Sequence, residues 1–556
     1  MKILITLIMA FGVLAEITPD WSRNVVLKDG ENRENIYGLS KEEFEEIKVE
    51  GLKHALVYPV TVSGLFIPYD PMVNFFKSQN SDLMGFILKL IGQDYSDITS
   101  EEGLYQWLGL NKYNDESATG IYRIPYPDGE KPDYYMGASI IKTKWGRALT
   151  FSCATCHSAN IFGTSVMGLT NKTVKANRLF HMAKKFVPFV PNKMFQRVTG
   201  ATDEEVEMMK RTKKNLKSVG ATLPQVLGLD TSLPQVALSL ARRNDDEYAT
   251  KNPFYEVFPK ANELDTKISD SKPAVWWNLK YKTRWLSDGS IVEGNPIFTN
   301  FLWNDLGRGT DLKELEKWMQ DNQKTVKQLT AAAFATQAPY WTDFFDVSTI
   351  DIDAAKRGEK HFNNTCKKCH GTYQKAWSLT YVNKLPSVEA IKTIKVIYHD
   401  KTPVKNVGTD PGRYEGTKAF ASGLNNLKIS KWMKTVVEPQ VGYVPPPLVG
   451  IWARYPYLHN NAVPTLCDLM TPPEKRTKTF YQIPSERKDQ DFDMECVGFP
   501  VGKNIPNDRK NKEAFFDTRK EGLSNKGHYK MFQTEDGQEK FTATEKKDLL
   551  MFLKTL

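Results

Sequence analysis

Two copies of one short cysteine and histidine pattern constrain this chain more than any other feature. The patterns are CATCH at residues 153–157 and CKKCH at residues 366–370. Two residues between the cysteines place both thiols on one side of a helical turn, where each can add to a vinyl group of haem, and the following histidine then binds the iron. The sequence therefore predicts two covalently attached haem c groups. The predicted attachment residues are Cys153, Cys156, Cys366 and Cys369, and the predicted proximal iron ligands are His157 and His370.

Other uses of paired cysteines explain less of this pattern. A zinc site that joins the two C-x-x-C pairs gives no reason for a histidine to follow both pairs. A thioredoxin-like redox motif needs only one pair. From the composition, chance would place two C-x-x-C-H matches in on the order of one chain in a million. Haem attachment is therefore the favoured interpretation.

The N-terminus has the pattern of a secretory signal. Residues Met1 to Ala15 combine a charge at Lys2, an apolar stretch and small residues before a cleavage site, and a buried first helix is the alternative. No later stretch reaches the roughly 18 apolar residues needed to span a bilayer, because Lys89 interrupts the best candidate, Leu83 to Ile91. We therefore expect a periplasmic or secreted protein with no transmembrane segment in its mature form, in agreement with haem c attachment outside the bacterial cytoplasm.

The two cysteines outside the motifs, Cys467 and Cys496, are both downstream of the second motif. In an oxidising compartment we expect a structural disulfide between them, and two buried free thiols are the alternative.

The charge balance argues against a nucleic-acid partner. The chain has 75 Lys and Arg against 66 Asp and Glu, a formal net charge of +9. The basic residues are interleaved with acidic ones, whereas nucleic-acid binding needs a concentrated basic face. We therefore interpret the charges as a solvated surface.

The motif positions divide the chain into sections. We expect a signal peptide at 1–15, an N-terminal extension of unknown role at 16–140, a first haem section at 141–345 and a second at 346–556. Helices are predicted at 41–52, 312–335 and 351–362, and the last of these leads into the second motif. Leu223 and Leu233 each begin an L-P-Q-V echo, which predicts a helix start with proline in the first turn.

The two haem sections are predicted to be related to each other. Aligning Pro273 with Pro447 places Trp285 opposite His459, twelve positions after each proline. Because this match falls at a comparable place after each motif, it favours tandem haem domains.

With these motifs the sequence resembles the dihaem cytochrome c peroxidase superfamily, and within it the branch that includes the bacterial rubber oxygenases. The resemblance spans roughly residues 100–556 and is carried, beyond the motifs, by Gly228 to Arg243, Gly450 to Met470, Pro472-Pro473 with Lys478-Thr479-Phe480, Gly522 to His528 and Phe552 to Leu556. It implies a mainly α fold, in which two tandem cytochrome c-like haem domains with long loops follow the N-terminal extension.

The resemblance also implies the remaining iron ligands. His528, at the end of a Ser-Asn-Lys-Gly-His segment, is the predicted distal ligand of the second haem, with Met470 as the alternative. His459 is expected to pack beside the haem through hydrogen bonds. For the first haem, His181 competes with an open sixth position, which is favoured and would be the reactive site.

An aromatic ring between the haems helps electron exchange in these peroxidases, where a tryptophan stands in a Trp-Asp-Gly segment. Trp285, followed by Asp288-Gly289, is the nearest equivalent here, and Trp277 competes with it. For both residues, ordinary packing in the core is the alternative.

Together these features predict an exported dihaem c-type oxidoreductase. The haem at His157 would reduce hydrogen peroxide or activate dioxygen, and the haem at His370 would relay or store electrons. A peroxidase would take electrons from a small cytochrome or cupredoxin. Two alternatives stay open: a dioxygenase that cleaves an unsaturated organic substrate, and a non-catalytic electron-transfer cytochrome with both irons closed.

Overall fold

The computed structural model describes residues 17–77, 98–243 and 268–556, so the predicted signal at 1–15 and the apolar stretch Leu83 to Ile91 lie outside it. The α-helices are α1 (Lys41–Leu56), α2 (Tyr69–Lys77), α4 (Glu101–Trp107), α5 (Ala154–His157), α6 (Ala176–Phe186), α7 (Asn192–Thr199), α8 (Asp203–Leu216), α9 (Leu233–Ala241), α11 (Pro296–Gly307), α12 (Leu312–Asp321), α13 (Gln323–Ala335), α14 (Ile352–Thr365), α15 (Lys367–His370), α16 (Ser387–Ala390), α17 (Gly412–Gly416), α18 (Ala421–Asn426), α19 (Lys428–Trp432), α20 (Leu466–Leu469) and α21 (Ala543–Lys554). The strands are β1 (Ile67–Pro68), β2 (Ala138–Thr143), β3 (Gly146–Phe151), β4 (Ser158–Ile161), β5 (Thr164–Met167), β6 (Thr231–Ser232), β7 (Asp270–Ser271), β8 (Ile291–Glu293), β9 (Thr372–Lys375), β10 (Thr393–Ile397), β11 (Val436–Val437), β12 (Thr479–Tyr481) and β13 (Phe515–Asp517).

Helices are the main regular structure, with small antiparallel sheets between them, which confirms the predicted mainly α class. Helix α1 starts at a capping box on Ser40, and α14 starts at the Asp351 side chain, because each cap satisfies free backbone N–H groups of the first turn. Of the two L-P-Q-V segments, the one at Leu233 begins α9 and the one at Leu223 lies in a loop. The helix start predicted at Leu223 was therefore wrong. None of the described helices is both long and apolar enough to cross a membrane.

The N-terminal section is built into the body that carries the first motif. Strand β1 pairs with β3, and the border expected at residue 140 falls inside β2, the other neighbour of β3. Helix α1 packs on α13 so closely that a Cβ atom at Gly51 would lie 2.0 Å from the carbonyl oxygen of Gln328. The described residues of this section, 17–77 and 98–140, therefore form no separate extension in space.

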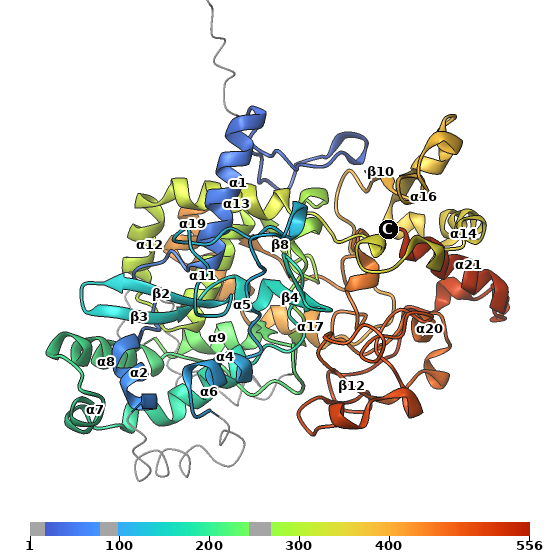
Figure 1. Ribbon diagram of the computed structural model, residues 1–556. Helices are drawn as coiled ribbons and strands as arrows, with labels where there is room; N and C mark the ends of the chain where they lie inside the picture. The colour runs from blue at the N-terminus through green and yellow to red at the C-terminus, as the bar shows by residue number, and fades with distance from the viewer. Residues whose placement is uncertain (1–16, 78–97, 244–267) are drawn as a thin grey trace, which may run out of the picture.

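Each haem section packs some of its segments into the core of the other, so the prediction of two consecutive domains is corrected. Helices α17 to α19 belong to the second section by sequence, but they lie among the elements of the first section in Figure 1. Phe420 and Leu424 share a hydrophobic cluster with Phe301 and Leu302 of α11, and β11 pairs with β8. In return, Ile161 of β4 is buried in the cluster of the second section. The border near residue 345 therefore divides the sequence and not the packed core.

The second motif has a helical frame. Helix α14 leads directly into it and crosses the C-terminal helix α21, on the right in Figure 1. A side chain at Gly358 would lie 2.0 Å from the carbonyl oxygen of Asp548, so the crossing needs glycine there. Arg357 donates two hydrogen bonds to the Asp548 carboxylate, at 2.8 and 2.9 Å. The first motif instead follows a β-hairpin, β2 and β3.

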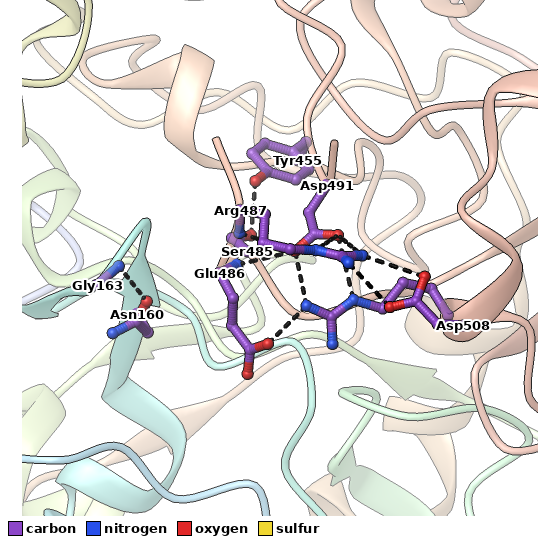
Figure 2. A network of polar contacts seen from close by, with 9 residues as sticks. Asn160, Gly163, Tyr455, Ser485, Glu486, Arg487, Asp491 and Asp508 are labelled. Carbon is purple, nitrogen blue, oxygen red and sulfur yellow. Dashed lines mark hydrogen bonds and ion pairs between the residues drawn. The ribbon is translucent and has the colours of Figure 1, made fainter. Parts of the chain in front are cut away.

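A polar network surrounds the Asp491 carboxylate in a loop of the second section (Figure 2), and the β4–β5 hairpin contacts this loop through a backbone hydrogen bond. The fully buried Asp491 carboxylate accepts hydrogen bonds from Arg487 and Arg509, and the backbone N–H of Phe162 donates to the Ser485 carbonyl at 2.7 Å. Burial alone would raise the pKa of Asp491, but the hydrogen bonds from both arginines outweigh it and lower that pKa. The network therefore ties the surroundings of the first motif to the second section.

Candidate haem sites

One cavity of about 520 Å³ connects the two motifs. Its walls include, from the motifs, Cys153, Cys156, His157, Cys366, Cys369 and His370. Two loop segments, around residues 271–287 and 443–459, complete the wall between them. Residues that are far apart in the chain thus meet at one site.

In each motif the backbone makes the helical turn that the spacing predicted. The N–H groups of His157 and His370 donate to the carbonyl oxygens of Cys153 and Cys366, both at 3.0 Å. The turns are helices α5 and α15, and the thiols of both pairs face the cavity.

At the second motif the proximal histidine is already oriented. The Nδ1 atom of His370 lies 2.8 Å from the carbonyl oxygen of Pro446. A hydrogen bond from Nδ1–H to that oxygen fixes the ring and leaves Nε2 as the metal-binding atom. The ring of His528 lies opposite, with the two ring centres 6.0 Å apart.

This spacing fits an iron between the two rings. Two metal–nitrogen bonds of about 2 Å each, with roughly 1.1 Å from each nitrogen to its ring centre, need about 6 Å. Burial lowers the pKa of His370 to about 4 and that of His528 to about 3, so both rings are neutral at pH 7, as iron ligands must be. The donor set at the second motif therefore fits haem c with two histidine ligands.

The loop that carries His528 is held in a strained conformation. The φ angle of His528 is 49°, and a Cβ atom at Gly527 would lie 2.3 Å from the backbone of Gly408. The buried guanidinium of Arg476 donates to the carbonyl oxygen of Gly527 at 3.0 Å, and it also donates to Leu469 at 3.1 Å. Arg476 thus ties the His528 loop to α20. Strain that the surroundings maintain in this way is typical of functional sites.

The first motif has different neighbours. The ring centre of Trp276 lies 5.2 Å from that of His157. The Nδ1 atom of His157 is buried near the backbone of Ala274 without a hydrogen bond. Arg308 donates to the Phe151 carbonyl at 2.6 Å and also lines the cavity. All eight histidines of the chain are among the described residues, and no second histidine ring lies against His157.

The other predicted ligands lie elsewhere. His181 is half-buried on α6, with Nδ1 3.4 Å from the Ala221 carbonyl, and Met470 is packed in the core of the second section; neither lines the cavity. His459 does line the cavity, and its ring stacks on Tyr443 at 3.9 Å between centres. Among the described residues the His459 side chain makes no hydrogen bond, which differs from the hydrogen bonds that the sequence led us to expect.

The internal repeat is visible in the backbone, but in a different register. Trp285 forms an antiparallel bridge with Ile291, and Tyr457 forms the same bridge with Val463. Positive φ angles follow at matching positions, at Leu286 and Leu458 and again at Gly289 and Asn461.

In this register Trp285 corresponds to Tyr457 and not to His459, which corrects the alignment made from the sequence. The cause is the run of three prolines, Pro445 to Pro447, which offers three alignments to Pro273, and only backbone pairing selects one. Ala274, beside His157, then corresponds to Pro446, beside His370.

The three nearby tryptophans take different positions. Trp285 lines the cavity and donates from Nε1 to the Gly294 carbonyl at 3.2 Å. Trp277 is buried in the core, donates to the Val449 carbonyl and does not line the cavity. Trp276, which sequence reasoning passed over, lines the cavity beside His157. Its adjacency to Trp277 was the available signal, but only the fold shows which of the pair faces inward.

The predicted disulfide is confirmed. Cys467 and Cys496 are bonded, with Cα atoms 5.1 Å apart. A structural disulfide agrees with an extracytoplasmic location.

Comparison with known proteins adds a family match to this geometry. Residues 442–481 match the family model described as RoxA-like, cytochrome c-like. A RoxA-like cytochrome c-like domain is present there. These residues include Pro446, which accepts the hydrogen bond from His370, and Arg476. A cytochrome c-like domain implies covalently bound haem c.

Two curated proteins of Sinorhizobium fredii (strain NBRC 101917 / NGR234) are similar to this chain. Uncharacterized protein y4iJ is 23% identical over 468 residues, which cover 69% of this chain and 73% of that protein. Uncharacterized protein y4iM is 32% identical over 123 residues, 20% of this chain and 27% of that protein. Neither name states an activity, so these two proteins support no particular reaction.

Proposed function

We propose that the protein is an exported dihaem c-type oxidoreductase with one closed and one reactive haem. The observation that carries the proposal is the asymmetry of one shared cavity, in which His370 faces His528 across 6.0 Å while His157 faces no second histidine of the described chain. A haem with two histidine ligands transfers electrons, whereas a free sixth position admits a small oxidant.

In this proposal the chain supplies attachment and orientation. Cys153 with Cys156 and Cys366 with Cys369 would hold the two haems, and the haem iron would supply the redox chemistry. His157 and His370 would each bind the iron of the haem at their own motif, and His528 would also bind the iron at the second motif. Trp285 lines the cavity and is the candidate for electron exchange between the haems.

The substrate divides the proposal into two variants. Reduction of hydrogen peroxide needs an outside donor, such as a small cytochrome or cupredoxin. Oxygenation of an unsaturated organic substrate with dioxygen does not, and the RoxA-like match at residues 442–481 favours this second variant.

Optical and EPR spectra of the protein, produced in a host with haem-attachment machinery, test the proposal. We expect one low-spin haem that ignores carbon monoxide and cyanide and one haem that binds both. Two low-spin haems that stay closed on reduction would instead identify an electron carrier. Oxygen uptake with a polyisoprenoid, against peroxide consumption with a reduced donor, then separates the two enzymes.

A further inference from the structure

The wall between the motifs carries a cluster of cations without counter-charges. Lys272, Lys282 and Arg454 all line the cavity. Lys272 donates from Nζ to the carbonyl oxygen of Arg454 at 3.3 Å, and Arg454 donates from Nη1 to the carbonyl oxygen of Pro447 at 2.7 Å. The Nζ atom of Lys282 has no hydrogen-bond partner among the described residues.

Within the described part of the chain, no carboxylate pairs with any of the three. Burial and the charge of Arg454 lower the pKa of Lys272 to about 7 and that of Lys282 to about 8. Arg413, on the same wall, differs because Asp288 and Asp270 act on it with opposite charge. Lys282 is buried and Lys272 and Arg454 are half-buried. Grouping such cations without an anion is costly, so a cavity that keeps three of them is suited to negative charge.

The repeat explains how two of these cations are placed. Lys282 follows directly after the 3-10 helix η6 (Trp276–Tyr281), and Arg454 follows directly after the 3-10 helix η12 (Ile451–Ala453). In the backbone register defined by the Trp285 and Tyr457 bridges, Lys282 and Arg454 are equivalent residues. Each lies eight residues after the backbone position beside its proximal histidine, Ala274 or Pro446.

We infer that Lys282 and Arg454, together with Lys272, which contacts Arg454, bind the propionate carboxylates of the haems: Lys282 at the first motif and Arg454 at the second. Each repeat then places a backbone position, Ala274 or Pro446, beside the histidine of its motif and supplies a cation for a haem carboxylate. Arginine suits a carboxylate because its guanidinium can donate two parallel hydrogen bonds. This assignment rests on the proposed attachment of two haems.

Charge-removing and charge-keeping variants test the assignment. We would measure the two midpoint potentials between pH 5 and 8 for Arg454→Gln, Lys282→Gln and their conservative partners Arg454→Lys and Lys282→Arg. The control is Lys405→Gln, because Lys405 lines the same cavity but is exposed to water. The haem content of each variant is counted first from its pyridine haemochrome spectrum.

We expect Arg454→Gln to lower the potential of the second haem and Lys282→Gln that of the first. The missing cation raises the pKa of the propionate, so that a proton accompanies the electron on reduction and the potential becomes more dependent on pH. The conservative variants should restore the wild-type profile, and Lys405→Gln should change little.

The outcomes separate the two proposals. Fewer than two haems in the wild type would overturn the proposed function, and the Arg454 variants would still test the second site. Two haems with unchanged potentials in the glutamine variants would overturn the propionate assignment alone. A wild-type potential that shifts on adding acetate or succinate would also overturn it, because the cations would then bind a carboxylate from solution.

Discussion

The two C-x-x-C-H motifs are nearly the same in sequence and differ in everything that surrounds them. The second follows helix α14, which crosses α21, and its histidine is hydrogen-bonded to Pro446 and faces His528. The first follows a β-hairpin, and its histidine lies beside Trp276. A motif of five residues sets attachment, whereas the elements packed around it decide whether the sixth position of the iron is filled.

Under the proposed function, this difference gives the two sites different roles. A rigid site with both axial positions held changes little between oxidation states, which suits electron transfer. A site without a second histidine can admit a ligand. The shared cavity wall, built from the two repeat segments, places the sites in one enclosure.

Removing one cysteine pair at a time should have the largest effect, because only one of the two haem sites would then remain. Cys153→Ala with Cys156→Ala should leave one haem per chain with a closed, low-spin spectrum. Cys366→Ala with Cys369→Ala should leave one haem that binds carbon monoxide. Pyridine haemochrome spectra and EPR measure both, and a closed haem in the second variant would contradict the assigned roles.

His528→Ala should make the two sites alike. Without the distal ring, nearly all of the low-spin signal of the second haem should convert to high spin, and that haem should bind carbon monoxide. His181→Ala is the matched control, since His181 is not part of the cavity wall, and its spectrum should equal that of the wild type. An unchanged spectrum in His528→Ala would exclude this ligand.

Arg476→Met should weaken the second site without removing a ligand. The variant leaves the carbonyl oxygens of Gly527 and Leu469 without their donor, so we expect a loss of about 3 kcal/mol in the free energy of unfolding. Without the hydrogen bonds of Arg476, the His528 loop should be less fixed, and we expect a mixture of low-spin and high-spin haem at the second site. Arg519→Met is the control, since Arg519 pairs with Asp517 at the surface. A fully low-spin spectrum in Arg476→Met would leave Arg476 a purely structural role.

Asp491→Asn should weaken the contact between the β4–β5 hairpin and the second section, near the first motif, and leave both haem spectra intact. We expect a loss of about 3 kcal/mol at pH 7, because Arg487 and Arg509 lose their buried partner. The pKa of Asp491 is lower in the folded state than in the unfolded one, so its contribution is present above the ordinary value of about 4 and is lost as the pH falls through the folded value.

The difference between wild type and Asp491→Asn in urea unfolding should therefore shrink at pH 3. If the stability difference between wild type and Asp491→Asn were the same at pH 3 and pH 7, packing and not the charge of Asp491 would stabilise this contact.

The smallest effect concerns the tryptophans. Trp285→Phe and Trp276→Phe should slow electron exchange between the haems a few-fold, since both rings line the cavity, whereas Trp277→Phe should not, because its ring lies in the core. Flash photolysis of the carbon monoxide complex of the partly reduced protein measures the rate. Equal rates in the wild type and all three variants would assign every one of these rings to packing.

The predictions that the structure confirms depend mostly on residues that are close together in the sequence. The turns of the motifs and the starts of α1 and α14 depend on residues a few positions apart, and the structure has them where the sequence predicts. The single helix predicted at 312–335 is instead divided at Asn322 into α12 and α13. The domain borders and the repeat register failed because they depend on which distant segments pack together. Helices α17 to α19 show this, since nothing in residues 412–432 indicates that they pack on α11.

By itself, the sequence predicted the covalent chemistry: where the two proposed haems would attach, which histidine follows each cysteine pair, and which two cysteines remain for a disulfide. These follow from residue types at short spacings, because attachment needs only one turn of backbone. The tertiary structure alone decided that His528 faces His370, that Arg476 holds its loop, and that Lys282 and Arg454 share a wall without a carboxylate. These depend on contacts across the chain, where burial and charge act through distance in space and not through distance in sequence.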